Sequence, residues 1–196
     1  MQAHRYFVLN KPIHMVSQFV SCHSVKLLCD LDFAFPHGTH AIGRLDQNSE
    51  GLLLLTTNKK ITKLLFQSVV PHKRTYLVQV QNKVIPETLI QLANGIAISA
   101  PNGNSFITTP CEVIQVDKPS YLWEAADFLH ENVQNSWLQI TLTEGKFHQV
   151  RKMVAAVNHK CIRLIRTAIE DISIVNLPPG AVLEMKEDDF FSMLHL

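Results

Sequence analysis

Four consecutive leucines, Leu52–Leu55, follow directly after a segment bounded by two glycines, Gly43 and Gly51. An uninterrupted apolar run of strand length is typical of a strand that is buried on both faces at the centre of a sheet. Two further segments, 76–80 and 137–143, alternate in the manner of strands with one buried face. A chain with these three segments must therefore build its fold around a sheet.

Helical signals lie between the strands. Asn58 is placed to cap a helix over 59–67, and Pro86 and Gly95 begin and end a second helix over 86–94. We also expect helices over 24–31 and 146–157, and the latter carries Phe147, Val150, Met153, Val154 and Val157 on its apolar face. The remaining expectations are strands at 6–9, 111–116, 162–165, 172–175 and 181–185, and a long surface loop at 117–134. This mixture predicts an α+β fold with a mixed, largely antiparallel sheet and flanking helices.

Composition excludes several classes of protein. With 46% apolar residues the chain can bury a sizeable core, yet no apolar run approaches the ~20 residues of a membrane helix. The polar start, residues 1–5, is no signal peptide, so we expect a cytoplasmic protein with no membrane partner. Ten histidines show no metal-ligand spacing, so no metal site is predicted. No C-x-x-C pair occurs, which favours reduced thiols for Cys22, Cys29, Cys111 and Cys161.

The net charge of +1 hides an uneven distribution. Residues 59–83 contain six basic side chains and no acidic one, and residues 142–167 contain six basic side chains against Glu144 alone. Two such blocks can line a positive cleft for nucleic acid. They can equally be solvated faces of helices, and charge alone leaves both interpretations open.

The segment before the leucine strand holds a candidate catalytic acid. Asp46 lies in Gly43–Gly51, where the two glycines free the backbone and the buried strand anchors it. This arrangement can hold one carboxylate rigidly at a cleft. An ordinary Arg-Asp turn is the alternative for the bare tetrapeptide Gly43–Asp46.

The whole stretch from Gly43 to Thr56 resembles the catalytic signature of pseudouridine synthases, in the branch that modifies ribosomal RNA. Other stretches resemble the same family in the expected order, and together they span nearly the full chain: Tyr6–Pro12, Lys73–Val80, Leu142–Met153, Cys161–Arg166 and Leu177–Gly180. The resemblance implies the catalytic core of that family over 1–196, with two lobes that share one sheet, a central cleft and no separate N-terminal RNA-binding module. Four of these, Tyr6–Pro12, Gly43–Thr56, Lys73–Val80 and Leu142–Met153, are motifs that follow one another in the family order, which makes coincidence improbable.

The resemblance also implies an activity and its residues. The family isomerises uridine to pseudouridine with no cofactor and no metal, and its catalytic carboxylate corresponds to Asp46. Arg151 would pair with that carboxylate, with a phosphate contact as the alternative. Tyr76 would pack on the target base, unless it is an ordinary half-buried strand tyrosine, and Val150 would line the same pocket. Arg44 would brace the loop or meet RNA.

Several basic residues are candidates for contacts with RNA phosphates, which position RNA without reading its sequence. They are Lys11, Lys73, Arg74, Lys146, His148, Lys152, Arg163 and Arg166, and Lys11 could instead brace the loop.

Three positions depart from the family pattern. His148 replaces an arginine, while Asn158 and Glu170 replace glycines, and asparagine tolerates the left-handed turn that glycine would make there.

The predicted function is isomerisation of one uridine in ribosomal RNA, by a monomeric enzyme. The missing N-terminal module resembles the subgroup that modifies large-subunit ribosomal RNA, so we expect a structured site in free or early-precursor RNA. Within the enzyme class, the alternatives are a synthase for small-subunit ribosomal RNA or for transfer RNA. A non-catalytic RNA-binding or ribosome-assembly factor that kept the fold is the alternative from another class.

Overall fold

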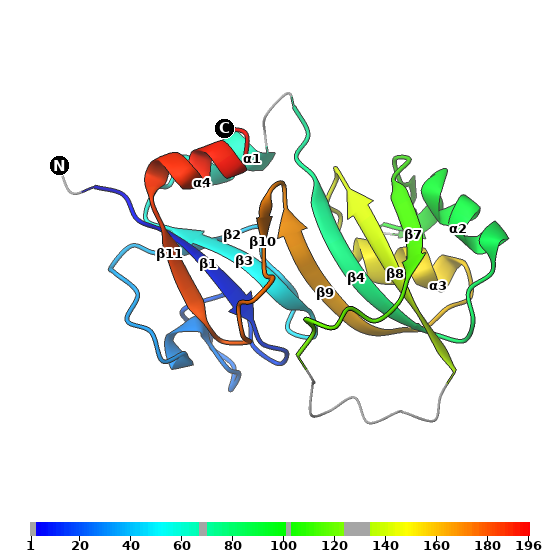
Figure 1. Ribbon diagram of the computed structural model, residues 1–196, viewed down its shortest axis with the longest axis horizontal. Coiled ribbons are helices and arrows are strands. Elements are labelled where there is room, and N and C mark those ends of the chain that lie inside the picture. Colours follow the sequence, from blue (N-terminus) through cyan, green and yellow to red (C-terminus); the bar gives the residue numbers. More distant parts are fainter. Residues whose placement is uncertain (1–2, 67–69, 101–102, 124–133) are drawn as a thin grey trace. The chain divides into compact units, whose positions relative to one another are not determined.

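The computed structural model describes residues 3–66, 70–100, 103–123 and 134–196. The chain divides into two compact units (Figure 1), of which unit 1 comprises residues 1–72 and 166–196, and unit 2 comprises residues 73–165. The chain passes from unit 2 into unit 1 within strand β9 (Cys161–Ile169). Both units combine helices with antiparallel strand pairs, so the predicted α+β class is confirmed.

Unit 1 is built around two fully buried strands. Strand β1 (Tyr6–Lys11) pairs antiparallel with β3 (Glu50–Thr56) and with β11 (Val182–Met185), and β2 (His40–Ile42) pairs with β3. Every residue of β1 and β3 is buried, so the prediction of a central strand at 52–55 is confirmed. Strand β10 (Ile172–Ser173) forms a hairpin with the end of β9.

Both faces of these strands carry apolar packing. On one face Phe7, Leu53 and Leu55 form a cluster with other buried side chains of unit 1. Helix α4 (Glu187–Met193) packs by its Phe190 ring, which lies 4.7 Å from the ring of Tyr6 between centroids. Helix α1 (Ile61–Phe66) buries Ile61 and Leu65, and Asn58 accepts a hydrogen bond from the Lys60 amide as an N-terminal cap.

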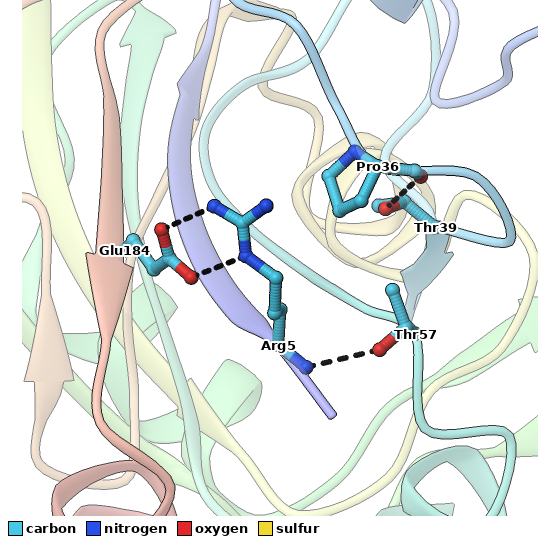
Figure 2. A network of polar contacts seen from close by, with 5 residues as sticks. All are labelled: Arg5, Pro36, Thr39, Thr57 and Glu184. Atoms are coloured by element: carbon cyan, nitrogen blue, oxygen red, sulfur yellow. Dashed lines mark hydrogen bonds and ion pairs between the residues drawn. The ribbon is translucent and has the colours of Figure 1, made fainter. Parts of the chain in front are cut away.

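Polar contacts fix the outer strands of unit 1. Figure 2 shows Arg5 donating from Nε and Nη2 to the Glu184 carboxylate, at 2.6 Å each, which ties the start of β1 to β11. The Arg5 amide also donates to the hydroxyl of Thr57 at 2.9 Å. In the loop before β2, the Thr39 hydroxyl donates to the Pro36 carbonyl at 2.7 Å.

Unit 2 packs two helices against a second antiparallel set of strands (Figure 1), in the order β4 (Arg74–Gln81), β8 (Asn135–Leu142) and β7 (Glu112–Val116). The core joins alternate residues of β4 and β8 to helices α2 (Pro86–Ala93) and α3 (Gln149–Ala156). A hairpin of β5 (Ala97–Ser99) and β6 (Ser105–Ile107) completes the unit, and α3 contacts β5. The strands expected at 76–80 and 137–143 are thereby confirmed, but Leu77 and Trp137 are buried as well, so burial does not alternate strictly along either strand.

One expected helix is absent, and one observed helix was not expected. Residues 24–31 form only a short 3₁₀ turn, Leu28–Asp30, because Lys26 and Leu28 exchange backbone hydrogen bonds with the extended residues Val16 and Gln18. The sequence analysis also missed α4, although three acidic residues in its first turn favour a helix N-terminus. Much of the loop expected at 117–134 lies outside the described residues.

Candidate active site

The Asp46 loop, residues 43–49, joins β2 to β3 in unit 1. Its central leucine, Leu45, is buried, and the Ser17 side chain holds the backbone of that residue on both sides. Ser17 Oγ donates to the Leu45 carbonyl at 2.8 Å and accepts from the Leu45 amide at 3.0 Å. Asp46 itself is only half-buried. The backbone beside Asp46 is therefore fixed while its residue stays partly accessible to solvent.

Glycine is required where the Asp46 loop begins. Gly43 has φ +62°, and a Cβ atom there would lie 2.6 Å from Cζ of Phe66. Both the left-handed backbone and the close ring exclude a larger residue. Further along the loop, the His14 amide donates to the Gln47 carbonyl at 2.8 Å. These contacts give the loop one defined path.

Arg166 clamps both ends of this region. Its side chain is buried, and Nε donates to the Leu52 carbonyl at 2.8 Å while Nη2 donates to the Gly43 carbonyl at 2.7 Å. The guanidinium faces backbone carbonyls in the interior of unit 1, which disfavours the expected RNA phosphate contact of Arg166, and that role stays a prediction. A planar fork of N–H groups suits such double donation.

Lys11 is the second buried cation near the Asp46 loop, and its burial favours the expected role in bracing the loop over a phosphate contact. Its Nζ donates to the carbonyls of Pro12 and Met15, at 2.7 and 2.6 Å. Burial lowers the pKa of Lys11 to about 8, and the nearby carboxylates of Glu50 and Asp46 oppose this shift. The ammonium therefore braces the segment after β1 and contributes positive potential at Asp46.

This buried lysine predicts a specific dependence of stability on pH. Between pH 8 and 10.5 the unfolded chain keeps the Lys11 proton that the folded chain has lost. The free energy of unfolding should therefore rise with pH through this window, by up to about 3 kcal/mol from Lys11. Urea unfolding of the wild type and Lys11→Met across pH 7–11 measures the difference. Parallel profiles for the two proteins would contradict the assignment.

Three of the expected active-site residues lie in unit 2. Tyr76 on β4 is half-buried, and both Tyr76 and Val150 belong to the apolar core of this unit. Arg151 on α3 is half-buried, and its Nη1 lies 3.5 Å from Sγ of Cys161. Burial raises the pKa of that thiol, and the Arg151 charge opposes the rise. The pairing of Arg151 with Asp46 stays a prediction.

The remaining RNA-contact candidates fall into two groups. Arg74 and Arg163 are buried and donate to the carbonyls of Thr143 and Trp123, at 2.8 and 3.1 Å, so their contacts with RNA stay predictions that burial disfavours. Arg74 also lies against Gly145, where a Cβ atom would approach its Nη1 to 2.9 Å. The accessible candidates are Arg44, Lys73, Lys146 and His148, which are exposed, and Lys152, which is half-buried.

The two departures from glycine keep left-handed backbones. Asn158 has φ +64° at the end of α3, as expected for asparagine. Glu170, in the turn between β9 and β10, has φ +46°. Its Oε1 lies 3.2 Å from Nδ1 of the buried His72. A contact with this imidazole offsets a backbone conformation that glycine would adopt without strain.

Substitutions at Glu170 should separate the effect of its strained, left-handed backbone from the effect of its contact with His72. Glu170→Ala and Glu170→Gly both lose the carboxylate, but only alanine keeps the strained φ. We expect the glycine variant to be more stable than the alanine variant by about 1–2 kcal/mol in urea unfolding. Equal stabilities of the two variants would show that this turn relaxes and stores no strain.

Metal centres and membrane-spanning helices are absent from the described ranges of the chain. Within them, no group of three or more His, Cys, Asp or Glu side chains is arranged to hold a metal ion. No helix there is both long and apolar enough to cross a membrane.

Comparison with known proteins identifies relatives over nearly the whole chain. A family model described as RNA pseudouridylate synthase matches residues 5–156. Ribosomal large subunit pseudouridine synthase E of Xanthomonas axonopodis pv. citri is 35% identical over 88% of the chain and 89% of that protein. Ribosomal small subunit pseudouridine synthase A of Salmonella typhimurium is 30% identical over 96% of the chain and 74% of that protein. A crystal structure of a pseudouridylate synthase superposes with a TM-score of 0.77 at 25% identity, covering 98% of the chain and 75% of that structure.

Proposed function

The chain belongs to the RNA pseudouridylate synthase family and is an isomerase, and we propose that it converts a uridine of ribosomal RNA to pseudouridine with Asp46 as the catalytic carboxylate. The observation that carries the assignment of Asp46 is the construction of its loop. Ser17 and Arg166 hold the backbone at Leu45, Gly43 and Leu52, while Asp46 stays half-buried.

The reaction explains why one fixed carboxylate is valuable. The N1–C1′ bond of uridine breaks, the base turns, and a C5–C1′ bond forms. The C5 proton is lost and N1 gains a proton, so the product is an isomer and no electron donor or acceptor is consumed. A carboxylate held in place before the substrate arrives avoids the cost of ordering it during the reaction. That no cofactor takes part stays a prediction.

We propose large-subunit ribosomal RNA as the substrate. Four relatives named as large subunit synthase E are 31–35% identical to this chain, against 28–30% for three named as small subunit synthase A. The higher sequence identity to synthase E favours large-subunit ribosomal RNA as the substrate. A synthase for small-subunit ribosomal RNA is the second candidate. The exposed basic side chains of unit 2 support an RNA substrate, because phosphates are bound by accessible cations.

The target base must leave its stack to reach a side chain such as Tyr76, and unstacking costs a few kcal/mol. We therefore expect a uridine in a structured but weakly paired region, modified in free or early-precursor RNA. Pseudouridine mapping in ribosomal RNA from cells with and without this protein tests the assignment. Loss of a single pseudouridine in the large-subunit RNA is the expected result. Loss in small-subunit RNA would move the substrate, and unchanged maps would contradict the function.

A further inference from the structure

Phe147 is not where the periodicity of the sequence places it. The sequence predicts Phe147 on the apolar face of a helix over 146–157, but α3 begins only at Gln149 and Phe147 is 66% exposed. The reason is His148, which has φ +55° and turns the chain before the helix. The Gln149 side chain is buried instead, accepting from the Lys146 amide at 2.9 Å and donating to Glu144 at 2.7 Å.

The exposed ring is part of a surface that we name the Phe147 platform, comprising Phe106, Lys146, Phe147, His148 and Lys152. The rings of Phe147 and His148 stack with centroids 3.8 Å apart and an angle of 18° between their planes. Lys152 Nζ lies 5.4 Å from the Phe147 centroid, and Lys146 Nζ lies 4.6 Å from the Phe106 centroid.

This surface is held in one arrangement by the rest of unit 2. Lys152 Nζ donates to the Ser99 carbonyl at the end of β5, at 2.7 Å, which fixes the cation beside Phe147. The nearest carboxylate in the sequence, Glu144, accepts from the Thr109 amide and from Gln149. The Phe147 ring therefore lies exposed at the surface, with the His148 ring stacked on it and the Lys152 ammonium held near it.

We propose that Phe147 stacks on an unpaired base of the RNA substrate, a base other than the uridine that is isomerised. Aromatic faces bind bases of any sequence by stacking, and neighbouring cations bind the phosphates of the same strand. An acidic protein segment would use the cations but gain little from a flat, exposed ring pair. The identity of the RNA rests on the proposed function, whereas the stacking contact is measurable without catalysis.

The test is the affinity of purified protein for a fluorescently labelled single-stranded oligouridylate of twelve nucleotides. Phe147→Ala should raise the Kd about 5- to 100-fold, which is the range for loss of one base–aromatic stack. Phe147→Trp should bind at least as tightly as the wild type, and Phe147→Leu should resemble the alanine variant. The slope of log Kd against log salt concentration (the salt slope) should be unchanged in Phe147→Ala. It should be smaller in Lys146→Gln, because only this variant loses a charge.

Matched controls separate stacking from other causes. Ile90→Ala removes a similarly exposed apolar side chain on α2, 60% exposed, and should bind like the wild type. A blunt RNA duplex, whose bases are already stacked, should not discriminate between wild type and Phe147→Ala. Equal binding of the oligonucleotide by wild type and Phe147→Ala, or equal binding by the leucine and tryptophan variants, would overturn the proposal. Absence of isomerisation by the wild-type protein, with binding of the oligonucleotide intact, would contradict the proposed function and leave the stacking contact standing.

Discussion

Asp46→Asn should lower the rate of pseudouridine formation by at least about 10²-fold while leaving the fold and RNA affinity unchanged. The amide keeps the size of the side chain but removes the negative charge and the ability to take up a proton. Catalysis by a positioned acid or base contributes about 10²- to 10⁴-fold. The measurement is single-turnover conversion of a ribosomal RNA transcript, with Kd measured separately. A variant with near wild-type turnover would show that another group is the catalyst.

A companion variant tests whether position matters as well as charge. Asp46→Glu keeps the carboxylate but moves it by about one bond length, and a displacement near 1 Å can cost about 10²-fold. The loop contacts of Ser17 with Leu45 involve the main chain of the loop, so neither substitution at Asp46 removes them. Unchanged thermal unfolding is therefore the expected control for Asp46→Glu, whereas Asp46→Asn should be folded but slightly less stable, because it loses the carboxylate near the buried Lys11 ammonium.

Arg166→Met should lower both stability and turnover. Two charge-assisted hydrogen bonds to the carbonyls of Gly43 and Leu52 are lost, and two buried acceptors remain. We expect a loss of about 2–5 kcal/mol in the free energy of unfolding. Turnover should fall about 10- to 100-fold under conditions where the variant is folded, because the Asp46 loop loses its clamp. Urea unfolding and single-turnover kinetics measure the two effects.

The opposite interpretation of Arg166, as a phosphate contact, predicts a different pattern. It predicts a raised KM, a reduced salt slope and unchanged stability. Arg166→Lys sharpens the comparison, because one ammonium cannot replace the planar fork at both carbonyls but would still bind a phosphate. Lys73→Met, at an exposed residue of the other basic block (residues 59–83), is the control. It should reduce the salt slope without changing stability.

Strands were predictable from this sequence where packing follows directly from the pattern. The run Leu52–Leu55 and the alternation at 76–80 each report burial on particular faces, and the strands observed extend these segments by only a few residues. The helix expected at 24–31 failed because hydrogen bonds to Val16 and Gln18, which no local pattern records, hold that segment extended. Where the local sequence pattern is weak, tertiary contacts determine the secondary structure.

The candidate site was predictable in its residue types and less so in their roles. The glycine-flanked turn made Asp46 the candidate carboxylate. Gly43 has the positive φ, +62°, that glycine adopts without strain. Basic residues were harder, because a sequence does not distinguish an arginine that reaches a phosphate from one that binds carbonyls inside the protein. Arg166 and Arg74 are of the second kind. Phe147 was assigned to the core because the left-handed turn at His148 has no signature in the periodicity.

The most direct measurement follows the hydrogen at C5 of uridine, which must leave when C5 bonds to C1′. Transcripts of large-subunit ribosomal RNA, small-subunit ribosomal RNA and transfer RNA are made with uridine tritiated at C5 and incubated with the purified protein. We predict release of close to one equivalent of tritium from the large-subunit transcript and none when Asp46→Asn is used. No release from any of the three RNAs by the wild-type protein would contradict the proposed function.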